Sequence, residues 1–251
     1  MKNKILEISH LTKKFKNTVV LNDISMTLED AKIYGFTGRN GSGKTMLMKH
    51  ILGFVHPTSG MVCINGKRIG HDIDIPQNVG AIIENPGFLP EYSGFKNLKL
   101  LAGIRRKAST EEIRQAIELV GLNPNDKKHV GKYSLGMRQR LGLAQVLMEN
   151  PEILLLDEPM NGLDDQGVEE MRQIFLQQKE KGKLIIIASH NNEDIDLLCD
   201  DIFRFDHGSL IPSIKCLTGT IFKQLICGLL DLAELQVSAK STKQLKSCYL
   251  P

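Results

Sequence analysis

The 251-residue sequence contains no tryptophan, few other aromatic residues and only five cysteines. The cysteines are odd in number and none lies in a CxxC pair, which argues against both a disulfide framework and a zinc site. The net charge is only +3. The segment after residue 210 contains five lysines and two acidic residues, Asp231 and Glu234, so it accounts for the whole of this charge. The first 210 residues are therefore neutral overall, a poor footprint for nucleic-acid binding.

Long apolar runs are also missing. The longest, "EILLLDEP" and "KLIIIASH", fall far short of the roughly 20 residues that a membrane helix needs. The start, "MKNKILEISH", has no apolar stretch of the kind found in a secretion signal. We therefore expect a cytosolic globular protein that acts on a membrane only through a partner.

The order of strand and helix patterns predicts an α/β fold. Alternating runs near the start and an Asn-Gly turn in "MVCINGKRI" predict an antiparallel β-subdomain. The runs "AKIYGFTG", "NVGAIIEN", "EILLLDEP" and "KLIIIASH" predict strands of a parallel sheet, because helical patterns alternate with them. Two helical patterns, "ASTEEIRQAIELVGL" and "GMRQRLGLAQVLMEN", lie within residues 91–150, and the first starts at a capping box of Ser109 and Glu112. We expect one domain over residues 1–210, a helical subdomain at 91–150 inserted in it, and a tail at 211–251 without recognisable pattern.

The stretch "GFTGRNGSGKTMLMKH", which starts at Gly35, predicts a phosphate cradle. It contains the pattern G-x-x-x-x-G-K-[ST] between a predicted strand and a predicted helix. Glycines let backbone N–H groups turn toward phosphate oxygens, and the helix N-terminus favours the same anion. We expect Lys44 to contact the β- and γ-phosphates and Thr45 to bind Mg²⁺. The predicted nucleotide-binding residues here are Gly38, Arg39, Asn40, Gly41, Ser42, Gly43, Lys44, Thr45 and Met46.

Hydrolysis of a nucleotide also needs a held metal ion and a positioned water. The apolar run "EILLLDEP" ends in Asp157 and Glu158, which places two carboxylates at the carboxyl edge of the predicted sheet, where ligands of α/β proteins bind. We expect Asp157 to hold Mg²⁺ and Glu158 to polarise the attacking water.

A third stretch distinguishes among nucleotide-binding machines. "YSLGMRQRLGLA", from Tyr133 to Ala144, resembles the signature motif of ABC transporter ATP-binding subunits. Ser134 and Gly136 match that motif, while Leu135 and Met137 replace its usual Gly and Gln. The S-L-G-M form with its basic helix resembles exporters of the bacitracin and lantibiotic-immunity kind. The resemblance spans Met1 to about Gly208 and implies a P-loop NTPase (RecA-like) core.

Further residues match the family in order along the chain. Phe15 stands where the family stacks adenine, and His190 follows an apolar run like the family's switch histidine. Asp164 matches the family's D-loop, but Asp165 replaces a usual proline. Glu84 stands where the family normally has Gln, a change typical of exporters that protect against lantibiotics. Glu84 keeps an oxygen for Mg²⁺ or water but adds negative charge near the γ-phosphate.

The resemblance implies an ATPase, catalysed by Glu158, His190 and Lys44, that uses ATP and Mg²⁺. It also implies a head-to-tail homodimer in which Ser134 and Gly136 of one copy cover ATP on the other. The partners would be integral-membrane permease subunits at the cytoplasmic face of the membrane, docked on residues 85–95, whose aromatics look exposed. We expect export of antimicrobial peptides or similar amphipathic compounds. A soluble ABC ATPase uncoupled from transport, or a regulatory subunit that does not hydrolyse ATP, are the alternatives.

Overall fold

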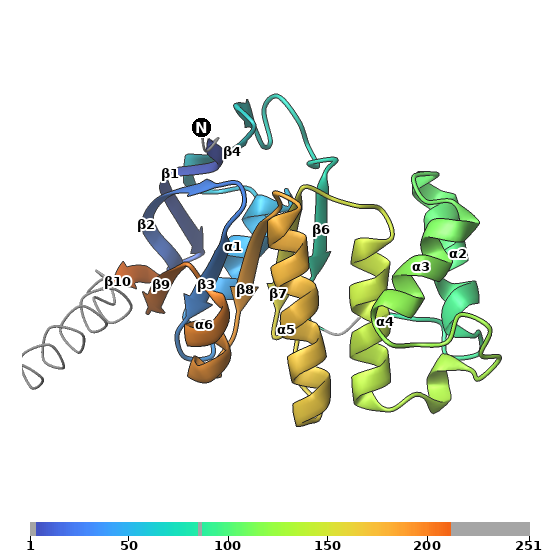
Figure 1. The fold of residues 1–251 in the computed structure, drawn as a ribbon. Coiled ribbons are helices and arrows are strands. Elements are labelled where there is room, and N and C mark those ends of the chain that lie inside the picture. The colour runs from blue at the N-terminus through green and yellow to red at the C-terminus, as the bar shows by residue number, and fades with distance from the viewer. Residues whose placement is uncertain (1–3, 85–86, 212–251) are drawn as a thin grey trace, which may run out of the picture. The chain divides into compact units, whose positions relative to one another are not determined.

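The computed structural model of the chain describes residues 4–84 and 87–211, and the predicted tail lies, from residue 212 onwards, outside this part. Two long strands come first, and strands and helices then follow in mixed order, with three successive α-helices in the middle of the chain (Figure 1). The strands are β1 (Lys4–Phe15), β2 (Thr18–Glu29), β3 (Ile33–Thr37), β4 (Ser59–Ile64), β5 (Lys67–Arg68), β6 (Val79–Ile82), β7 (Ile153–Asp157), β8 (Leu184–Ala188), β9 (Asp201–Asp206) and β10 (Ser209–Ile211). The helices are α1 (Lys44–Ile51), α2 (Gly94–Arg105), α3 (Thr110–Leu119), α4 (Leu135–Leu147), α5 (Asp165–Glu180) and α6 (Asn192–Leu198), with a 3-10 turn at Val130–Lys132.

The N-terminal strands form the predicted antiparallel sheet, in the order β2-β1-β4-β5. Alternation along β1 buries Leu6 and Ile8, and a register shift after Ile8 brings Leu11 to a buried position as well. Asn65 and Gly66 join β4 to β5 with φ angles of 50° and 75°. Two successive positive φ angles suit the twist of a tight hairpin and favour Asn-Gly, so the predicted hairpin is confirmed.

The second sheet has the order β10-β9-β3-β8-β7-β6, and its strands are parallel except for β10 at one edge. Apart from Asp157 at the end of β7, the strands β7 and β8 consist of apolar residues, because both faces of the sheet are covered. In β7, Leu154 and Leu156 pack into one hydrophobic cluster, whereas Ile153 and Leu155 pack into the other. Each such fully buried side chain contributes about 1.5–3 kcal/mol of transfer free energy. The predicted α/β architecture is therefore confirmed.

Helices α2, α3 and α4 lie between β6 and β7 in the chain and stand beside the second sheet (Figure 1). The capping box of Ser109 and Glu112 starts α3 as predicted, with the Ser109 N–H donating to Glu112 Oε2 over 2.7 Å. Ile117 and Leu141 of these helices share one hydrophobic cluster with Leu154 of the sheet. The inserted helices are thus packed onto the core, which agrees with the predicted fold class.

Two expectations about the segment after β6 are corrected. The strand ends at Ile82 instead of Glu84, because Glu84 adopts a left-handed backbone conformation with a φ of 61° that turns the chain away from the sheet. The aromatic side chains of Phe88 and Phe95 are half-buried against the core instead of exposed. Asn85 and Pro86, the first residues of the expected docking segment, lie outside the described residues.

No helix within residues 4–84 and 87–211 combines the length and the apolar character that crossing a membrane demands.

Candidate nucleotide site

The cradle connects β3 to α1, and its geometry requires glycine at Gly38 and Gly43. The φ angles of these two residues are 145° and 109°. A Cβ on Gly38 would lie 2.4 Å from the carbonyl oxygen of Phe205, and one on Gly43 would lie 2.7 Å from Leu21 Cδ2. The backbone therefore passes close to β9 and β2. Helix α1 begins directly after it without a side-chain cap, and the N–H groups of a first helical turn have no partner within the helix.

Two polar side chains of the cradle are buried. Lys44 is 6% exposed, and its Nζ donates to the carbonyl oxygens of Gly38 over 2.7 Å and Arg39 over 3.2 Å. Ser42 is 4% exposed, and its Oγ has no hydrogen-bond partner within the described part of the chain. Buried polar atoms normally have partners. An ammonium, an orphaned hydroxyl and a helix N-terminus together fit a phosphate group. Arg39, Asn40 and Gly41 are exposed around them.

The first carboxylate lies beside the cradle. Thr45 Oγ1 donates to Asp157 Oδ2 over 2.7 Å, so the end of β7 meets the first turn of α1. Burial is the main cause that raises the pKa of Asp157 above its usual value, and the charge of Glu158 raises it further, while the bond from Thr45 lowers it. A hydroxyl and a carboxylate are the oxygen ligands that Mg²⁺ prefers, with water and phosphate oxygens completing its shell. The described residues contain no group of three acidic, histidine or cysteine side chains that could hold a metal alone.

The second carboxylate, Glu158, is held by three hydrogen bonds from the end of β8. Its Oε1 lies 2.8 Å from His190 Nδ1 and accepts from the His190 N–H over 3.1 Å, and Ser189 Oγ donates to its Oε2 over 3.4 Å. Glu158 has a φ of 50°, and Gln139 Nε2 donates to its carbonyl oxygen over 3.1 Å. Neither Ser189 nor Gln139 was predicted as a site residue. Both could have been found from the sequence, because Ser189 directly precedes His190 and Gln139 lies within the signature stretch.

Glu84, predicted to offer an oxygen to Mg²⁺ or water, forms an ion pair with Lys49 in this structure. Lys49 Nζ lies 2.9 Å from Glu84 Oε1. The charge of Glu84 still contributes to raising the pKa of Asp157, after burial and the charge of Glu158, so the three carboxylates share one electrostatic environment.

Phe15 and the signature residue Ser134 lie at exposed positions, whereas Gly136 is half-buried. The Phe15 side chain, at the end of β1, is 46% exposed, with Lys13 Nζ 4.7 Å from its ring centroid. Ser134 is the exposed N-cap of α4, and its Oγ accepts from the Met137 N–H over 3.2 Å. No hydrogen bond or ion pair in the described part of this chain joins Ser134 or Gly136 to the cradle.

The ABC transporter family model matches residues 21–161, which include the cradle, Ser134, Asp157 and Glu158. The chain belongs to the ABC transporter family. It is accordingly an ATPase, the ATP-binding subunit of an ABC transporter.

Relatives support this assignment over most of the chain. The uncharacterized ABC transporter ATP-binding protein YybJ of Bacillus subtilis (strain 168) is 48% identical over 84% of this chain and 97% of its own length. The bacitracin transport ATP-binding protein BcrA of Enterococcus faecalis is 40% identical over 84% of this chain and 69% of its own. The lantibiotic transport ATP-binding protein SrtF of Streptococcus pyogenes is 36% identical over 82% of this chain and 89% of its own. A solved ATP-binding subunit of an ABC transporter shares the fold, with a TM-score of 0.75 at 24% identity over 93% of this chain and 99% of that chain.

The D-loop of this ABC subunit keeps a regular geometry despite its missing proline. Asp164 is the N-cap of α5, and its Oδ1 accepts from the Gly167 N–H over 2.9 Å. Asp165 is therefore the first helical residue, the position that proline also favours. A negative charge there interacts favourably with the helix dipole. The substitution thus preserves the helix start.

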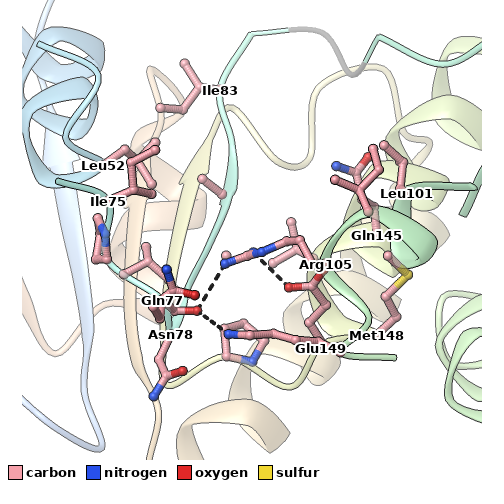
Figure 2. Close-up of a pocket in the computed structure, with 18 of the residues that line it drawn as sticks. Leu52, Ile75, Gln77, Asn78, Ile83, Leu101, Arg105, Gln145, Met148 and Glu149 are labelled. Carbon is pink, nitrogen blue, oxygen red and sulfur yellow. Dashed lines mark hydrogen bonds and ion pairs between the residues drawn. The ribbon is translucent and has the colours of Figure 1, made fainter. Parts of the chain in front are cut away.

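A groove of about 670 Å³ lies between β6, the end of α1 and the C-terminal ends of α2 and α4 (Figure 2). Its apolar lining includes Leu52, Phe54, Ile75, Ile83, Leu101 and Ile104. Polar side chains line another part of the groove (Figure 2). There Arg105 Nη1 donates to Glu149 Oε2 over 2.8 Å, and Arg105 Nη2 donates to the carbonyl oxygen of Gln77 over 3.2 Å. Ile83 lines this groove, whereas its neighbour Glu84 pairs with Lys49 of α1, the helix that starts at the cradle.

Proposed function

We propose that this subunit drives export of antimicrobial peptides, such as bacitracin or lantibiotics, and thereby protects the cell that makes or meets them. The observation that carries the proposal is its 36–40% identity, over more than four fifths of the chain, to proteins of bacitracin and lantibiotic transport. Neither alternative, an uncoupled ATPase or a regulatory subunit, is favoured by any relative reported above.

The test is resistance in a peptide-sensitive bacterial host. We expect the chain, expressed with a permease subunit that it binds, to raise the inhibitory concentration of bacitracin or of a lantibiotic severalfold. The same pair carrying Glu158→Gln should give no protection, because export needs hydrolysis. Equal protection by both forms would contradict an ATP-driven exporter, and no protection against either peptide class would contradict the substrate assignment.

The cradle residues would bind the nucleotide. We propose that Phe15 stacks on the adenine, because an exposed ring is ready to receive it. Residues Gly38 to Met46 would surround the phosphates, with Lys44 leaving the carbonyl oxygens it now contacts for phosphate oxygens. Thr45 and Asp157 would hold Mg²⁺, which neutralises phosphate charge when bound.

Glu158 would act as the base that orients and polarises the attacking water. Its carboxylate is already fixed by Ser189 and His190, so its free lone pairs can point at a single water position. We propose that His190 takes part in catalysis: it would contact the γ-phosphate while it holds the carboxylate of Glu158 in place.

We also propose one domain over residues 1–210, with a helical subdomain at 91–150 inserted in it, and a separate tail at 211–251.

We further propose a homodimer, with Ser134 and Gly136 of one copy covering ATP bound at Lys44 of the other. Ser134 starts α4, so its hydroxyl and the helix N-terminus can both meet the γ-phosphate. ADP lacks that group, so the closed dimer would weaken after hydrolysis, as expected for an equilibrium biased by a ligand.

Ser134→Ala is expected to weaken ATP-induced dimerisation while monomers still bind ATP with normal affinity. Light scattering in ATP and Mg²⁺, on the Glu158→Gln background, measures the first, and binding of a fluorescent ATP analogue measures the second. Loss of an N-cap costs about 0.5–2 kcal/mol of stability by itself. Ser109→Ala, which removes the N-cap of α3, is the matched control and should dimerise normally. A drop in monomer affinity with Ser134→Ala would place this serine in its own chain's site.

We propose that permease subunits contact this subunit from the cytoplasmic face of the membrane, through residues 85–95. Within the described part of that segment, Leu89 remains 46% exposed. Phe88 and Phe95 pack against the hydrophobic core that the helices of the inserted subdomain share. A displacement of the segment by the permease would therefore also displace these helices.

A further inference from the structure

Glu84 and Lys49 form a charge pair that the nucleotide chemistry described above does not use. Lys49 Nζ lies 2.9 Å from Glu84 Oε1, and the side chains are 31% and 68% exposed. Glu84 holds this position with a left-handed backbone, at a φ of 61°. A non-glycine residue in that conformation is uncommon and carries strain that its surroundings must offset.

The pair lies at the metal end of the cradle. Lys49 follows Thr45 by four residues on α1, so the two side chains share one face of the helix. Thr45 donates to Asp157 from that face. The influence of Glu84 on the pKa of Asp157, although smaller than that of burial, agrees with this closeness.

A third carboxylate at this place poses an electrostatic problem. Asp157 and Glu158 already bring negative charge to the site, and the nucleotide triphosphate brings more. A bare Glu84 would add to the repulsion of a triphosphate bound in the cradle, since neighbouring like charges disfavour each other. The one cation paired with Glu84 in the described residues is Lys49.

We propose that Lys49 is a positioning residue that neutralises Glu84 and holds its carboxylate beside the cradle, so that a glutamate is compatible with bound ATP at this position. The proposal rests on the function proposed above, because it assumes that the γ-phosphate lies near Thr45. It predicts that Lys49 is needed only while residue 84 is negatively charged. Because ADP has no γ-phosphate, the requirement should be stronger for ATP than for ADP.

The test is a double-mutant cycle on nucleotide binding, read without turnover. The variants are Lys49→Met, Glu84→Gln and the double variant, and the probes are methylanthraniloyl-ATP and methylanthraniloyl-ADP in Mg²⁺. We expect Lys49→Met to raise the Kd for the ATP probe about two- to fivefold, the range of a partly exposed ion pair, and the Kd for the ADP probe less. In the Glu84→Gln background the same substitution should change neither Kd, and Lys49→Arg should restore wild-type affinity.

Two controls separate the possible failures. Lys99→Met removes an exposed lysine of α2 and should leave both Kd values unchanged. Melting temperatures show whether each variant is folded. Equal effects of Lys49→Met in the wild-type and Glu84→Gln backgrounds, or equal effects on ATP and ADP, would overturn the proposal. If the wild type binds the ATP probe no better than Lys44→Ala, the proposed nucleotide site itself fails.

Discussion

Glu158→Gln is expected to bind ATP with near-normal affinity and to hydrolyse it about 10²–10⁴ times more slowly, the usual contribution of a positioned base. A glutamine keeps the size of the side chain and an oxygen that can accept from His190, but it cannot take a proton from water. Phosphate release under saturating ATP measures the rate, and binding of a fluorescent ATP analogue measures the affinity.

The same variant should accumulate as an ATP-bound dimer, because the step that opens the dimer is blocked. Glu118→Gln, an exposed glutamate of α3, is the matched control and should keep wild-type turnover. Near-normal phosphate release by Glu158→Gln would remove this residue from the role of base.

Gly38→Ala is expected to weaken ATP binding by about 30-fold or more, because left-handed strain and a backbone clash each cost at least about 1 kcal/mol. The added Cβ would lie 2.4 Å from the Phe205 carbonyl oxygen and 2.7 Å from Ser42 Oγ. Because Phe205 is held in the sheet as part of β9, the cradle would have to move to relieve this clash. Its N–H groups would then no longer point toward the phosphates.

Gly41→Ala separates strain from clash within the same loop. Gly41 also has a positive φ, 80°, but a Cβ there would meet nothing within 4 Å. We expect a decrease in affinity of roughly tenfold or less for this variant. Equal losses in the two variants, measured by titration with a fluorescent ATP analogue, would contradict the role assigned to the close approach of β9.

Several parts of the fold were accessible from local patterns. The alternating strands, the Asn65-Gly66 turn and the capping box at Ser109 are encoded within a few neighbouring residues, and the structure contains each of them. Helix α2 was not predicted as an element, because its sequence "GFKNLKLLAGIR" has no clear apolar face. Leu98 and Ala102 are its only buried residues with apolar side chains. Helix α6 was also missed, since its seven residues are too few to show a period.

The features of the candidate site also divide into those that the sequence predicts and those that only the tertiary structure shows. The sequence alone determined that a phosphate cradle, two carboxylates after an apolar strand and a signature stretch occur in one chain, because each depends on short-range spacing and residue type. Only the tertiary structure decided that Thr45 meets Asp157, that Gln139 holds the Glu158 carbonyl and that Lys49 pairs with Glu84. These pairs join residues 112, 19 and 35 positions apart, and such contacts arise from how the sheet and helices pack together. Local chemistry along the chain does not encode them.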